Sequence, residues 1–184
     1  MLGPQIRNRP ITMPQLARPS QEDLKRWLET LDIDFYLCGA CDGYHLAHLQ
    51  QCQGVFDSKL ELMEPQGLLA FSTSVELRPT ALLTLHSQMN ELSQQFTELK
   101  LYIDVVDDTL PKLIISCHCL IGAGLTEAQF TEFLGHHQGQ TLALLKWIEE
   151  KQYAMTDEIQ SEISDDAEEG SELIFEMADQ HLLH

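Results

Sequence analysis

The stretch VFDSKLELMEPQGLLAFSTSVEL, residues 55–77, decides the fold of this chain of 184 residues. Charged and apolar residues alternate in KLEL at 59–62, as expected for a strand with one buried face. The residues EPQG at 64–67 are typical of a turn, because proline suits its second position and glycine its fourth. Residues 68–77 then continue as a second strand. The stretch therefore predicts a β-hairpin.

The residues on either side of this hairpin predict three helices and a second pair of strands. Upstream, Ser20-x-x-Asp23 approximates a capping box, and residues from 35 onward read as short extended pieces. Apolar residues at helical spacing predict the helices, and alternation predicts the strands. The predicted elements are a helix with the stripe Leu24, Trp27, Leu28 and Leu31; a helix with the stripe Leu82, Leu85, Met89 and Leu92; strands over 99–105 and 112–121; and a helix capped by Thr126-x-x-Gln129.

The order of these elements predicts the fold class. Hairpin-type connections join neighbouring strands, so the sheet is expected to be antiparallel with the helices to one side. We therefore expect an α+β domain over residues 20–155. Residues 1–19 hold four prolines and no acidic residue, and residues 156–184 hold ten acidic residues and no Lys or Arg. We expect these two segments to be a flexible arm and a flexible acidic tail.

The net charge of −18 excludes two classes of partner. Nucleic acid and anionic lipid bind proteins through dense Lys and Arg, and this chain has 11 of these against 29 acidic residues. It lacks an apolar run of about 18 residues that could cross a membrane, and residues 1–19 lack a signal-peptide pattern. We expect a cytoplasmic protein that binds neither nucleic acid nor membrane. The common hydrolase motifs are also absent, so we do not expect an enzyme.

Three stretches of this sequence resemble the bacterial YbjN family. They are LDIDFYLCGACDGYHLAHLQQCQGVFD at 31–57, VELRPTALLTL at 75–85 and DVVDDTLPKLIIS at 104–116, and the ending Leu183-His184 fits as well. The resemblance implies a fold like that of type III secretion chaperones, with three helices on an antiparallel sheet. It also implies a role in sensory transduction. It supplies no catalytic residues, and it leaves open whether the chain forms a homodimer.

The spacing Cys38-x2-Cys41-x3-His45-x2-His48 is a candidate zinc site, because thiolates and imidazoles suit zinc. The two pairs lie closer together than in common zinc modules. Two other readings stay open, namely ordinary loop and core packing and a redox Cys-x-x-Cys pair. If residues 44–49 form a strand, the two histidines point to opposite faces and cannot share one ion.

The remaining cysteines and glycines favour structural roles. Cys117 and Cys119 fall on the inward face of a predicted strand, where a free thiol packs as a small apolar group. His118 then points outward. Gly122 and Gly124 flank a tight turn, and they lack the third glycine of a dinucleotide-binding fingerprint.

The acidic tail contains apolar residues that could anchor a docked helix. Leu173, Ile174 and Phe175 interrupt its charged residues, and Trp147 is a candidate surface aromatic on the last helix. We expect a non-enzymatic regulatory or chaperone-like module that binds a protein partner of apolar and partly basic character. The alternative is a zinc-stabilised or metal-responsive sensor built on the cysteine and histidine cluster.

Overall fold

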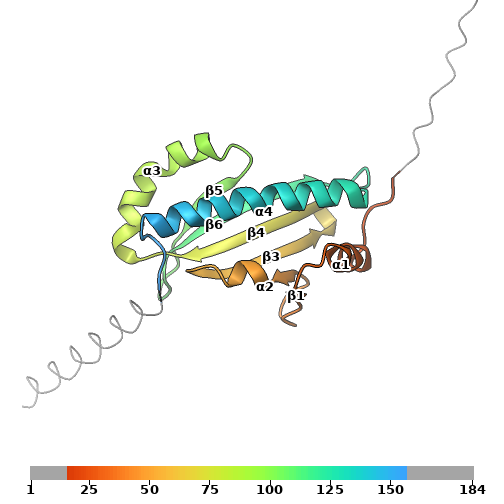
Figure 1. The fold of residues 1–184 in the computed structure, drawn as a ribbon, viewed down its shortest axis with the longest axis horizontal. Coiled ribbons are helices and arrows are strands. Elements are labelled where there is room, and N and C mark those ends of the chain that lie inside the picture. The colour runs from red at the N-terminus through yellow and green to blue at the C-terminus, as the bar shows by residue number, and fades with distance from the viewer. Residues whose placement is uncertain (1–15, 157–184) are drawn as a thin grey trace, which may run out of the picture.

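The computed structural model describes residues 16–156 and contains one antiparallel sheet of six strands (Figure 1). Its strand order is β1-β2-β3-β4-β6-β5. The strands are β1 (Phe35–Tyr36), β2 (Tyr44–Leu46), β3 (Val55–Met63), β4 (Leu68–Glu76), β5 (Lys100–Asp104) and β6 (Lys112–Leu120). The helices are α1 (Gln21–Thr30), α2 (Ala47–Gln50), α3 (Leu82–Gln95) and α4 (Glu127–Glu150).

The predicted hairpin over 55–77 is confirmed as the centre of the sheet. β3 and β4 pair over nearly their whole length, with Leu60 opposite Phe71 and Met63 opposite Leu68. A short 3-10 turn, Glu64–Gln66, joins them and ends at Gly67. Gly67 adopts φ 64°, a left-handed conformation that favours glycine. The sequence EPQG therefore sets both the position and the sharpness of this turn.

Helices α1 and α4 are fixed at their starts by the capping residues that the sequence predicts. The Ser20 hydroxyl accepts from the backbone N–H of Asp23 at the start of α1, and Thr126 accepts from Gln129 at the start of α4. Both arrangements are complete capping boxes. α1 and α4 meet where the rings of Trp27 and Phe130 lie 5.1 Å apart. The predicted α+β fold with three main helices is thus confirmed.

These helices cover one face of the sheet, and Figure 1 shows α4 lying in front of the strands and running nearly along them. On that covered face, alternate strand residues are buried in one core with the helix residues. This face includes Leu60, Leu62, Leu69, Phe71, Leu113 and Ile115. Cys117 is buried in this core and Cys119 packs against it, as predicted.

The opposite side of the sheet, here called the open face, carries the residues that alternate with the core. They include Lys59, Glu61, Ser72, Ser74, Tyr102, Ile114, His118 and Leu120. Residues 1–15 and 157–184, which hold most of the predicted arm and tail, lie outside the described residues. Among the helices that the structure describes, none combines the length and apolar character needed to cross a membrane.

Candidate functional site

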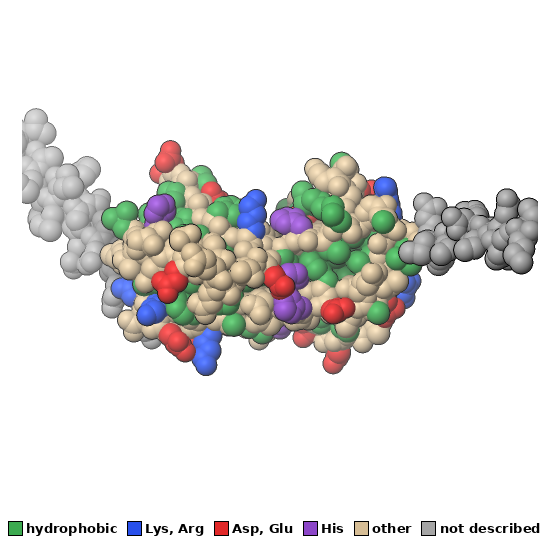
Figure 2. All heavy atoms as spheres, turned by 90° about the horizontal axis from the view of Figure 1, so that it is seen from above, with side chains coloured by type: hydrophobic (Ala, Val, Ile, Leu, Met, Phe, Trp, Pro, Cys, Tyr) green, Lys and Arg blue, Asp and Glu red, His purple; other side chains and the backbone are tan. Residues whose placement is uncertain are grey.

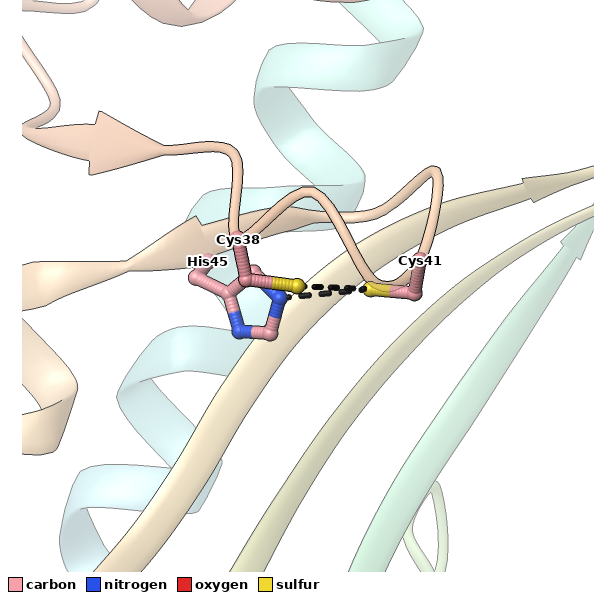
Figure 3. Close-up of side chains that lie close together, drawn as sticks. All are labelled: Cys38, Cys41 and His45. Carbon is pink, nitrogen blue, oxygen red and sulfur yellow. Dashed lines mark hydrogen bonds between the residues drawn. The ribbon is translucent and has the colours of Figure 1, made fainter.

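Two thiols and an imidazole meet beside the first two strands (Figure 3). Cys38 and Cys41 lie on the loop between β1 and β2, and His45 lies on β2. The two Sγ atoms are 3.5 Å apart, and Cys41 Sγ is 3.3 Å from His45 Nε2. One donor atom from each of the three residues lies within 4.8 Å of the others. We call these three residues the thiol cluster.

His45 is held on the open face by a carboxylate from the neighbouring strand. β2 pairs with β3 so that His45 lies opposite Lys59, and Asp57 lies two residues from Lys59. His45 Nδ1 is 2.6 Å from Asp57 Oδ1. An ionised carboxylate only accepts hydrogen bonds, so Nδ1 carries the proton and Nε2 presents its lone pair to the thiols.

Two further side chains hold this carboxylate and ring in place. Gln50 donates to Asp57 over 2.9 Å, and it accepts from the Tyr36 hydroxyl over 3.0 Å. The Tyr36 ring also stacks on the His45 ring at 5.0 Å. Because His45 is only 6% exposed, these contacts fix its orientation.

The environment of the thiol cluster favours a thiolate on Cys38. The backbone N–H of Ala40, the thiol of Cys41 and the backbone N–H of Cys41 together lower the pKa of Cys38 to about 7. Burial lowers the pKa of His45, but its hydrogen bond to Asp57 and the charges of Asp57 and Cys38 outweigh burial and raise it. Cys117 differs sharply, since burial raises its pKa to about 12. Of these two cysteines, Cys38 has the chemistry of a reactive or metal-binding thiol.

The fourth residue of the predicted zinc pattern lies apart from the thiol cluster. His48 is on α2, and its Nε2 is 3.3 Å from the side-chain amide of Gln138 on α4. It therefore faces the helices, whereas His45 lies on the open face. The chain leaves β2 and turns into a helix at Ala47, so the segment is neither one strand nor one helix.

The predicted partner-binding residues fall into two groups. Trp147 is half-buried, packs against the core and lies 5.6 Å from the Tyr153 ring. Leu173, Ile174 and Phe175 lie outside the described residues.

A second group of titratable side chains lies along α4. Seen from above, histidines gather near the middle of the molecule beside a hydrophobic patch (Figure 2). A hollow of about 590 Å³ is lined by Glu98, Gln129, Glu132, Phe133, His136 and His137. His136 pairs with Glu98, and the pKa of His137 is lowered by burial and by the adjacent His136. This group contains no thiol; the His137 ring packs edge-on against Phe133, and its buried Nδ1 has no hydrogen-bond partner among the described residues.

Comparisons with known proteins identify the fold and the family together. Residues 20–150 match the YbjN family, described as "Putative bacterial sensory transduction regulator". The chain belongs to the YbjN family. It is 33% identical over 128 residues to the YbjN proteins of Escherichia coli K12 and Shigella flexneri, covering 70% of this chain and 80% of each relative.

The YbjN fold is also recognised in a crystal structure. YbjN from E. coli, described as "a putative transcription regulator", superposes with a TM-score of 0.72 at 30% identity. The match covers 77% of this chain and 99% of the E. coli chain. The family is thus one of regulators by description, and no enzymatic activity is indicated for it.

Asp57 is the site residue of this YbjN-family chain that sequence reasoning missed. The alternation in β3 does place Asp57 on the open face. Its approach to His45, however, depends on the pairing register of β2 with β3, which no local pattern reveals.

Proposed function

We propose that this chain is a regulator that acts by binding a polypeptide partner on the open face of its sheet. The observation that supports the proposal is a set of large apolar side chains standing exposed on that face. Tyr102 is 45% exposed and Leu120 80%. Phe56, 59% exposed, lies at the β-bulge between Val55 and Asp57, where the alternation of β3 breaks, and its ring packs against Lys112 of the open face. Aromatic residues in such positions are the kind that anchor protein interfaces.

The middle of the open face differs from its rim. Ala70, Ser72 and Ser74 on β4, with Ser116 opposite Ser72 on β6, form a row of small side chains at the centre, and the larger Ile114 and His118 lie on either side of Ser116 along β6. Phe56, Tyr102 and Leu120 lie on other strands or at strand ends, so large side chains surround small ones. This arrangement suits an extended segment or a helix that lies across β4 and touches the rim with its apolar residues.

The charges on the open face are nearly balanced by pairing. Lys59 lies 3.0 Å from Glu61, and Lys112 lies 3.8 Å from Glu76. Lys112 also sits 3.5 Å from the centre of the Phe56 ring, which helps to hold that ring. We infer that apolar contacts supply most of the affinity. The overall charge of −18 favours the approach of a basic partner over an acidic one.

We propose the apolar residues of the tail, Leu173, Ile174 and Phe175, as a second docking element. A truncation that tests them has to keep the end of the domain. Ala154 and Met155 are buried, and Ala154 forms a β-bridge with Leu77. A chain ending at Thr156 is therefore the suitable comparison, because removing Ala154 and Met155 would also damage the core.

The experiment begins with affinity purification of the full chain from its native host, with partners identified by mass spectrometry. The dissociation constant for the purified partner is then measured with the triple variant Phe56→Ala, Tyr102→Ala and Leu120→Ala. We expect binding at least about tenfold weaker, since each anchor of an interface contributes more than about 1 kcal/mol.

The matched control is Leu83→Ala with Leu142→Ala, which removes exposed leucines from α3 and α4. This control should bind with the affinity of the natural chain. Equal loss in both variants, or unchanged binding by the triple variant, would refute docking on the open face. If partner binding is lost only in the chain that ends at Thr156, the tail and not the open face binds the partner.

A further inference from the structure

We propose that Cys38, Cys41 and His45 bind one zinc ion, with Asp57 as the residue that orients His45. The inference goes beyond partner binding and does not depend on it. It rests on the positions of three donor atoms, on the turn that carries the two thiols and on the contact that fixes the imidazole.

The separations of the donor atoms match those that tetrahedral zinc requires. Zinc lies about 2.3 Å from sulfur and about 2.0–2.1 Å from nitrogen. In a tetrahedron, these lengths place two sulfurs about 3.8 Å apart, and a sulfur and a nitrogen about 3.6 Å apart. The Cys38–Cys41 and Cys41–His45 separations are 3.5 and 3.3 Å. These two separations need shifts of only a few tenths of an ångström. The Cys38 and His45 donor atoms lie within 4.8 Å of each other, so the exposed Cys38 side chain can move in to close the site around an ion.

The turn from Cys38 to Cys41 favours metal binding for a second reason. Gly39 adopts φ 74°, and a Cβ added there would meet no atom within 4 Å. The left-handed backbone, and not crowding, therefore favours glycine here. This turn aims the backbone N–H of Ala40 at Cys38 Sγ over 3.4 Å. Such a contact stabilises a thiolate, the form of cysteine that binds metal.

The imidazole is arranged as metal-binding histidines usually are. Its Nδ1 proton is held by Asp57, so Nε2 is free to donate its lone pair. Histidines that bind metal commonly donate the other N–H to a carboxylate, which fixes the ring and increases its basicity. A histidine that only packs between strands does not require this orientation toward two thiols.

Three protein donors leave a fourth tetrahedral position. Cys38 is exposed, so we infer that water fills this position. Cys41 also lines a hollow of about 680 Å³ with Leu37, Asp42, Tyr44 and Glu64 among its other walls. Zinc in such a site should exchange more readily than zinc held by four protein ligands. Binding releases the remaining thiol protons, and its affinity should rise with pH.

The test uses the full chain without a histidine tag, reduced and freed of metal by a chelator. Titration with cobalt(II) should give one equivalent bound, with tetrahedral ligand-field bands and a thiolate-to-cobalt charge-transfer band. Zinc should displace the cobalt one for one. Binding of less than about a tenth of an equivalent by a chain whose thiols are verified as reduced would overturn the proposal.

Substitutions of single residues test which side chains bind the zinc ion. Cys38→Ser changes an exposed side chain, so the fold should survive, while zinc affinity should fall at least about a hundredfold and the charge-transfer band should lose about half its intensity. Asp57→Asn should weaken zinc binding by about 10–100-fold while keeping both thiolate bonds. His48→Gln and Cys52→Ser are the matched controls and should bind as the natural chain does.

Two other results would contradict the proposal clearly. Retention of full affinity by Cys38→Ser would exclude the assigned ligands. Formation of a Cys38–Cys41 disulfide in air, with no metal taken up by the reduced chain, would instead identify a dithiol pair. Circular dichroism and urea unfolding of each variant separate lost ligands from lost folding.

Discussion

The two faces of the sheet are built from alternate residues of the same strands, yet their chemistry differs. The covered face carries Leu60, Phe71 and Leu113, each exposed by 2% or less. The open face carries Lys59, Ser72 and Lys112, which are the sequence neighbours of those residues. The thiol cluster and the exposed aromatic residues lie on the open face.

Because successive side chains point to opposite faces of a strand, each strand contributes residues both to the core and to the open face. Substitutions on the covered face are expected to affect folding, and those on the open face to affect binding. The cysteines follow the same division, with Cys117 in the core and Cys38 exposed at the edge of the open face.

The largest expected effect is a difference between the alkylation rates of Cys38 and Cys117. The pKa is about 7 for the exposed Cys38 and about 12 for the buried Cys117. Iodoacetamide reacts with thiolates, so at pH 7, with chelator present, Cys38 should react more than about a thousandfold faster. Peptide mass spectrometry over time measures both rates. Similar rates for the two thiols in the folded chain would contradict the division.

Shortening a side chain to alanine should lower the free energy of unfolding more on the covered face than on the open face. Leu60→Ala removes a fully buried side chain, so the free energy of unfolding should fall by about 2–5 kcal/mol. Lys59→Ala, one residue earlier on the open face, should change it by less than about 1 kcal/mol. Urea unfolding measures both. A comparable loss for both variants would show that the open face is packed as tightly as the covered one.

A buried pair of hydroxyls gives a smaller effect on the covered face. Ser58 and Thr73 are almost fully buried, and their hydroxyl oxygens are 2.8 Å apart. Ser58→Ala leaves the Thr73 hydroxyl without this partner and should cost about 1–3 kcal/mol. Adding Thr73→Val should then cost less than it does in the natural chain. Strict additivity in this double-mutant cycle would show that the hydroxyls do not interact.

The two histidines should give opposite, still smaller pH dependences. The pKa of His45 is raised in the folded chain, so its contribution is present below the unfolded pKa, near 6.5, and is lost as the pH rises through the folded pKa. Burial lowers the pKa of His48, against the opposing charge of Asp34. Its effect runs the other way, and stability falls as the pH drops below about 6.5.

Thermal unfolding between pH 5 and pH 8, roughly the range in which histidine titrates, separates these effects when metal is removed. Asp57→Asn should reduce the stabilisation at low pH that comes from His45. His48→Gln should remove the loss at low pH that comes from His48. Identical pH profiles for the natural chain and both variants would contradict the assigned directions.

The sequence predicted the architecture well because its signals are local. The capping residues Ser20 and Thr126, the EPQG turn and the alternation in β3 each act within a few residues. The sequence did not predict α2, a single turn of helix after β2, because four residues carry too little periodicity.

The candidate site was predicted only in part, because it depends on register. Cys38, Cys41 and His45 are close in sequence and meet in space. His48 is equally close in sequence, but α2 turns it toward Gln138 on the helical side. Asp57 reaches His45 from the neighbouring strand β3, and this contact follows from the register in which β2 and β3 pair. Local spacing therefore identified three donors and could neither reject the fourth nor find the carboxylate.

The most direct test of the open face as the binding surface is site-specific photo-crosslinking in the native host. A photoreactive amino acid is placed in the full chain at Phe56 or Tyr102 on the open face, and at Leu83 on α3 as the control. Leu83 is 83% exposed, so access to the label favours the control. We predict a discrete partner adduct from both open-face positions and none from Leu83. Adducts from Leu83 alone would contradict the account.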